Sequence, residues 1–82
     1  GTNYNNLMDY LRSIDQKELV KECTQYLVIN GLNAVSRVEK LYDRKYKAYF
    51  IYVNNSVYVL STESNNLYGD LDQIARSFRY AP

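Results

Sequence analysis

The sequence predicts a small α+β domain with two N-terminal helices, a three-stranded antiparallel meander and a C-terminal helix. A tyrosine-rich stretch, 45–60, contains two β-rich segments around Asn54-Asn55, which is typical of a hairpin. On both sides of it, apolar residues recur at helical spacing after residues that favour helix starts. At 82 residues, the chain is expected to form one α+β domain over 1–82.

The composition is that of a globular domain. Hydrophobic residues make up 46% and charged residues 23% of the chain, whose formal net charge is +1. That charge is far from the basic balance of a dedicated nucleic-acid binder. No apolar run approaches the roughly 20 residues that span a bilayer. We therefore expect a cytoplasmic protein with no membrane partner.

The first predicted helix lies near the N-terminus. Asn3 is the expected cap, because a short polar side chain can accept a hydrogen bond from the first turn. Leu7, Leu11 and Ile14 follow at spacings of four and three, which place them on one helical face. The pattern predicts a short amphipathic helix.

A second helix is predicted over 16–29. Asp15 and Glu18 form a pair resembling a capping box, and Asn30-Gly31 would supply a left-handed stop. The apolar residues between these signals recur at helical spacing, at Leu19, Cys23, Tyr26 and Leu27.

The stretch 34–42 has two interpretations. Val35, Val38 and Leu41 recur every third residue, which suits a short helix. A strand is favoured, because Asp43-Arg44 resembles a turn into the tyrosine-rich stretch and three strands form a more stable sheet than an isolated hairpin.

The hairpin has a defined register. With Asn54-Asn55 as a two-residue turn, Val53 lies opposite Ser56 and Ile51 opposite Tyr58. Side chains then alternate between two faces, neither of them polar. One face holds Ala48, Phe50, Tyr52, Val57 and Val59, and the other holds Tyr49, Ile51, Val53, Tyr58 and Leu60.

The final predicted helix follows Ser64-Asn65-Asn66. Asp70 is the expected cap, with Gln73 three residues later. The expected buried stripe consists of Leu71, Ile74, Ala75 and Phe78.

The sequence predicts no catalytic residue, cofactor or metal site. Histidine is absent, so imidazole-based catalysis is excluded. The single cysteine, Cys23, lies on the apolar stripe of the second predicted helix and is expected to be buried. Helix starts account for four carboxylates, Asp15, Glu18, Asp70 and Asp72. We therefore expect a protein that is not an enzyme.

The leading functional hypothesis is protein binding by a tyrosine-rich sheet face. Helices usually cover one face of a small sheet, so an apolar second face needs another cover. Tyr49, Ile51 and Tyr58 would form its centre, with Lys47 as a cationic rim. The expected partner is another protein or a second copy of the chain, in a homodimer.

The alternative hypothesis is nucleic-acid binding around the first turn of the meander. Basic groups beside aromatic rings suit phosphate contacts and base stacking. The residues in question are Lys40, Arg44, Lys45, Lys47 and Tyr46, although nearby Glu39 and Asp43 dilute their charge.

Overall fold

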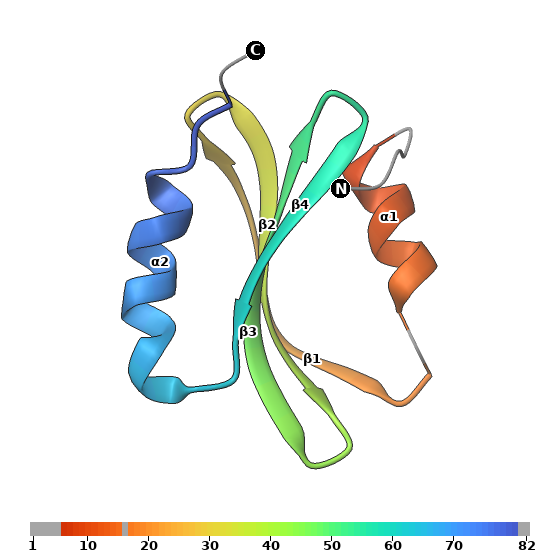
Figure 1. Ribbon diagram of the computed structural model, residues 1–82. Coiled ribbons are helices and arrows are strands. Elements are labelled where there is room, and N and C mark those ends of the chain that lie inside the picture. Colours follow the sequence, from red (N-terminus) through yellow and green to blue (C-terminus); the bar gives the residue numbers. More distant parts are fainter. Residues whose placement is uncertain (1–5, 16, 81–82) are drawn as a thin grey trace.

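The computed structural model describes residues 6–15 and 17–80, which form a four-stranded antiparallel sheet with one helix on each side (Figure 1). The strands follow chain order across the sheet, from β1 at one edge to β4 at the other. The elements are α1 (Leu7–Ile14), β1 (Leu19–Ile29), β2 (Leu32–Leu41), β3 (Arg44–Val53), β4 (Ser56–Thr62), the 3₁₀ turn η1 (Asn65–Leu67) and α2 (Tyr68–Arg76). No helix in this part of the chain is long and apolar enough to cross a membrane.

The α+β class is confirmed, but the predicted second helix is wrong. In the described part of the chain, the sheet has four strands, not three, and one helix precedes it, because most of the segment 16–29 forms β1. The predicted start at residue 16 lies outside the described residues. Hairpin pairing of β1 with β2 satisfies the main-chain groups of β1 that face β2, and it outweighs the helical spacing of the apolar side chains. Cys23, expected to be buried, is exposed on this strand.

The turn after β1 explains the error. Asn30 and Gly31 have φ angles of 49° and 84°, so both adopt the left-handed conformation that the sequence indicates. Two consecutive left-handed residues form the turn of a β-hairpin, whereas a helix stop needs only one. Asn30 also donates hydrogen bonds of 3.0 and 2.8 Å to the carbonyls of Arg76 and Phe78, which fastens the turn to the end of α2.

The remaining strands agree closely with prediction. Residues 34–41 of the stretch 34–42 lie within β2, so the favoured strand is confirmed. The turn after it consists of Tyr42 and Asp43, one residue earlier than expected. The hairpin of β3 and β4 has the predicted register, with Val53 opposite Ser56 and Ile51 opposite Tyr58. Asn54 and Asn55 both have positive φ, as the predicted turn requires.

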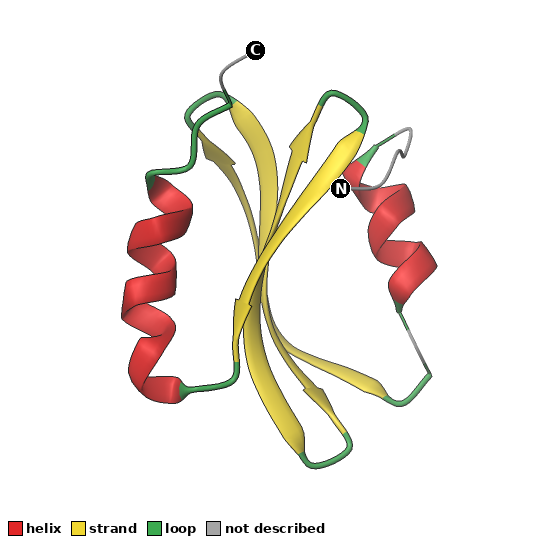
Figure 2. Cartoon of the chain, viewed as in Figure 1, coloured by secondary structure: helices red, strands yellow, loops and turns green. Residues whose placement is uncertain are grey.

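A helix of the same chain lies against each face of the sheet (Figure 2). On one face, Leu7 and Leu11 of α1 pack in a cluster with residues of β2, β3 and β4, namely Val35, Ala48, Phe50 and Val57. On the other face, Leu71 and Ala75 of α2 pack in a cluster with Ile29, Ala34, Tyr49, Ile51 and Val53. The face with Tyr49 and Ile51, for which the sequence predicts an external cover, therefore has an intramolecular one, and it is α2.

The two helix starts differ from prediction in detail. Asn6 caps α1 by accepting a 2.9 Å hydrogen bond from the Asp9 amide, whereas the predicted cap, Asn3, lies outside the described residues. α2 begins at Tyr68, so Asp70 lies in its first turn and not at its cap. Ile74 of the predicted buried stripe is exposed.

Candidate functional site

The predicted protein-binding residues share one face of the sheet, and α2 covers much of it. Tyr49 and Ile51 are buried, whereas Tyr58 on the edge strand β4 is 37% exposed, with its ring centre 5.6 Å from that of Phe78. Lys47 lies 2.7 Å from the Asp72 carboxylate. Partner binding by these four residues stays a prediction, but the packing already assigns Tyr49 and Ile51 to the core.

The buried Tyr49 hydroxyl has a structural partner on α2. It donates a 2.7 Å hydrogen bond to Asp72 Oδ1. Burial, together with this neighbouring carboxylate, raises the pKa of Tyr49 to about 12. Burial opposes ionisation of Asp72, but the hydrogen bonds from Lys47 and Tyr49 outweigh it and hold the Asp72 pKa below its usual value. This contact therefore fixes α2 to β3.

The predicted nucleic-acid residues do not form one basic surface. The strand alternation places Arg44 and Tyr46 on the α1 face, and Lys40, Lys45 and Lys47 on the opposite face. Lys45 pairs with Glu22 at 2.9 Å, and Lys47 pairs with Asp72. Nucleic-acid binding stays a prediction, weakened by this division and by the carboxylates.

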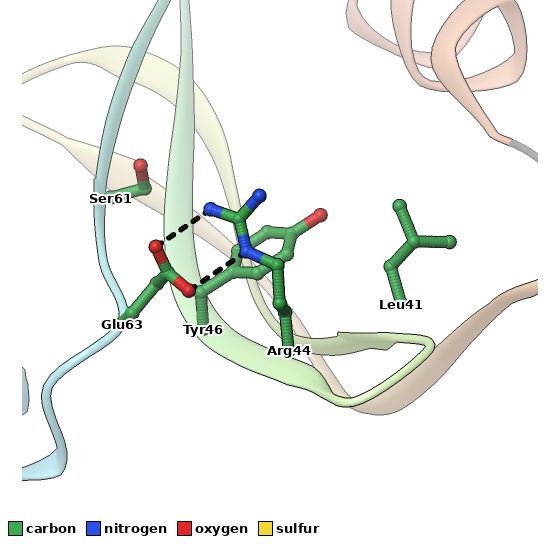
Figure 3. Close-up of a pocket in the computed structure, with 5 residues that line it drawn as sticks. All are labelled: Leu41, Arg44, Tyr46, Ser61 and Glu63. Atoms are coloured by element: carbon green, nitrogen blue, oxygen red, sulfur yellow. Dashed lines mark hydrogen bonds and ion pairs between the residues drawn. The ribbon is translucent and has the colours of Figure 1, made fainter.

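Arg44 is the clearest case of a paired cation (Figure 3). Its Nε and Nη2 donate hydrogen bonds of 3.0 and 2.7 Å to the two carboxylate oxygens of Glu63. The pair borders a hollow of about 270 Å³, which Leu41, Tyr46 and Ser61 also line. With its guanidinium held by one carboxylate, Arg44 is a weak candidate for a phosphate contact.

The most exposed apolar side chains of the sheet lie on β1, the element that the sequence assigned to a helix. β1 is an edge strand, so its outer main-chain groups face away from β2. The exposed fractions of Tyr26 and Val28 are 69% and 67%, and Val20 is exposed as well. An edge of this kind offers both main-chain hydrogen bonds and apolar contacts to another strand.

Two hollows lie between β1 and α1, and they share Met8 and Tyr26. One, of about 390 Å³, has a mostly apolar lining that includes Leu7, Val28 and Val35. The other, of about 440 Å³, is bordered by charged side chains, namely Arg12, Asp15, Lys21 and Arg37. Together with the outer edge of β1, these hollows form the candidate binding surface.

A buried ion pair lies beneath the charged hollow. Arg37 and Glu39, with side chains only 3% and 2% exposed, pair on the α1 face of β2. Arg37 also contacts Asp15 at 3.1 Å, and its guanidinium carbon lies 5.1 Å from the centre of the Phe50 ring. Asp15 in turn accepts a 3.1 Å hydrogen bond from Lys21. The network joins the end of α1 to the sheet.

Burial and charge act differently on the two carboxyl groups of this network. Burial raises the pKa of Glu39, although Arg37 opposes the shift. Burial acts in the same direction on Asp15, but the hydrogen bonds from Lys21 and Arg37 outweigh it and lower the Asp15 pKa. Two oppositely charged residues two positions apart on a strand share a face, which is the sequence signal for this pair. Sequence reasoning favoured a strand for 34–42 but did not identify this pair.

Comparison of the chain with protein-family models, with curated proteins and with solved structures finds no match.

Proposed function

We propose that the protein is a non-catalytic protein-interaction module that binds an extended segment of another chain along β1. The observation that carries this proposal is the exposed edge of β1, with Tyr26 and Val28 beside it. An added strand would pair with the free main-chain groups of β1, and its side chains would alternate between the two faces of the sheet.

The hollows beside β1 support this mode of binding. A side chain on the α1 face of the added strand would project toward Tyr26, Val28 and Met8, which border the apolar hollow. Main-chain pairing would supply affinity, whereas the hollow would select the side chain that it accommodates. The proposal thus transfers protein binding from the face beneath α2 to the α1 face and the free edge.

β1 offers a longer free edge for pairing than β4, the other edge strand. β1 has eleven residues and β4 has seven. Tyr58 and Leu60 of β4 also contact the α2 side of the core. Val59 nevertheless projects from β4 on the α1 face and is 45% exposed, which makes it a matched control for the apolar residues of β1.

Selection from a displayed library of random peptides tests the proposal. Peptides selected on the wild-type protein should bind Tyr26→Lys and Val28→Lys at least tenfold more weakly, because a lysine would disrupt the apolar contacts along β1. They should bind Val59→Lys normally. Circular dichroism should show that all three variants are folded, since the replaced side chains are exposed. Equal binding by the wild type and both β1 variants would overturn the proposal.

A further inference from the structure

We propose that the strand added to β1 is β1 of a second copy, so that two chains join their four-stranded sheets across a two-fold axis. This inference rests on the proposed function and names its partner. It requires that the charges and the register of two β1 strands allow them to pair, and that the space around β1 can hold the second copy.

Charge favours self-pairing. The segment 23–29 reads Cys-Thr-Gln-Tyr-Leu-Val-Ile and carries no charge. Lys21 and Glu22 precede it, at the irregularity in the pairing with β2. Antiparallel pairing of this segment with its own copy therefore places no like charges opposite each other, which is the usual obstacle to edge-to-edge association.

Register selects one position for the axis. Pairing of β1 with β2 is regular from Cys23 to Ile29, between the irregularity and the turn. An axis through Tyr26 uses this whole segment: Tyr26 lies opposite its own copy, Thr24 opposite Val28, and Cys23 opposite Ile29. Each pair joins side chains of the same face, as antiparallel pairing requires.

The space around β1 also permits the second copy. The buried side chains of α1 pack against β2, β3 and β4, and leave the α1 face of β1 exposed. In the joined sheet, the two β3 strands would be five strand spacings apart, a distance of roughly 24 Å. Two helices about 10 Å wide can lie over these strands without contact. The two α1 helices would border a channel, and Tyr26 and Val28 of both copies would line its base.

Sedimentation over a concentration series tests association. The wild type and Val59→Lys should form dimers, whereas Tyr26→Lys and Tyr26→Glu should each be at least tenfold weaker in dimerisation. Each substitution places two like charges opposite each other at the axis. Mixing the lysine and glutamate variants should restore the dimer, because opposite charges then meet. Failure of the mixture to dimerise would overturn the proposed axis.

Cysteine cross-linking tests the register independently. In a Cys23→Ser background, Tyr26→Cys should form a disulfide-linked dimer under mild oxidation, because directly opposite Cβ atoms lie about 5 Å apart. Gln25→Cys should react more slowly, since its copy lies diagonally at about 7 to 8 Å. Wild-type Cys23 should not cross-link, because it lies opposite Ile29 of the second copy, and Cys23 of that copy lies six residues further along the strand, at about 20 Å. Faster linkage through Gln25→Cys or Cys23 would overturn the register.

The two proposals can fail separately. A wild-type protein that stays monomeric at high micromolar concentration would overturn self-pairing. If the wild-type monomer still binds selected peptides and the Tyr26→Lys variant does not, strand addition along β1 is supported, with a partner other than a second copy. If it binds none, both proposals fail.

Discussion

Tyr49 Oη donates a 2.7 Å hydrogen bond to Asp72 Oδ1, which joins the centre of β3 to α2. The residue that the sequence places at the centre of a binding platform is therefore a structural link between the sheet and its C-terminal helix.

Tyr49→Phe should destabilise the fold by about 1–2 kcal/mol, because it removes a hydrogen bond to a charged group and retains the ring. Tyr58→Phe, at an exposed position of the same face, is the matched control and should have little effect. Urea unfolding at pH 7 measures the difference. Equal stability of Tyr49→Phe and the wild type would contradict the structural role of this contact.

Alkaline titration gives a second measure of the same contact. The pKa of Tyr49 is raised to about 12, above the ordinary value of 10. Its contribution to stability is therefore complete below pH 10 and is lost as the pH rises through 12, because the unfolded chain releases this proton first. Difference absorbance should show Tyr49 titrating near pH 12, and Asp72→Asn should lower that pKa. An unchanged titration in Asp72→Asn would argue against the contact.

Removing Arg37 from the buried pair of Arg37 and Glu39 should cost about 3–5 kcal/mol, because Glu39 is then a buried charge without its partner. Removing Glu39 should cost less, because Arg37 keeps its contact with Asp15. Arg37→Met and Glu39→Leu are the two single variants. Arg37→Met combined with Glu39→Leu should recover much of the loss, since an apolar pair needs no charge compensation. Chemical denaturation of the three variants forms a double-mutant cycle, and strictly additive losses would show that the pair is not coupled.

Acid should weaken the attachment of α1 through Asp15. Because the pKa of Asp15 is lowered in the folded state, its contribution is present above the unfolded value of about 3.9 and is lost as the pH falls through the lower folded value. Asp15→Asn should therefore lose less stability than the wild type between pH 5 and pH 2.5. Asp43→Asn, at an exposed turn residue, is the control and should follow the wild type.

Substitutions in the turn between β1 and β2 distinguish the effect of backbone conformation on stability from the effect of the Asn30 hydrogen bonds. Gly31 has a φ of 84°, so Gly31→Ala should cost about 1–2 kcal/mol. Asn30→Gly favours the left-handed turn but loses the two hydrogen bonds to the end of α2. Asn30→Ala loses the same hydrogen bonds and also disfavours the left-handed conformation. Thermal unfolding should rank the wild type above Asn30→Gly and Asn30→Gly above Asn30→Ala. The reverse order of these two variants would contradict the account of the turn.

Local signals predict the sheet well where pairing is regular. The alternation of β3 and β4 around Asn54-Asn55 is sufficient to derive both the register and the two faces. β1 is different, because its register with β2 shifts between Lys21 and Cys23, so the apolar residues on either side do not follow one two-residue period. As an edge strand with exposed side chains, it also lacks the alternation that burial imposes.

The candidate site was less predictable than the fold. Tyr49 and Tyr26 are both tyrosines among apolar neighbours, and only the packing of α2 shows that the first is buried and the second exposed. The local cue that could have indicated the free edge was Asn30-Gly31, since two left-handed residues between β-branched segments favour a hairpin.

Amide hydrogen exchange of the bound protein tests the central claim most directly, with either the second copy or a selected peptide as the bound strand. Protection should increase at alternate residues within 23–29, whose amides point away from β2, while amides of β4 should exchange at their unbound rates. New protection confined to β4 or to the helices, with none in β1, would contradict binding along this edge.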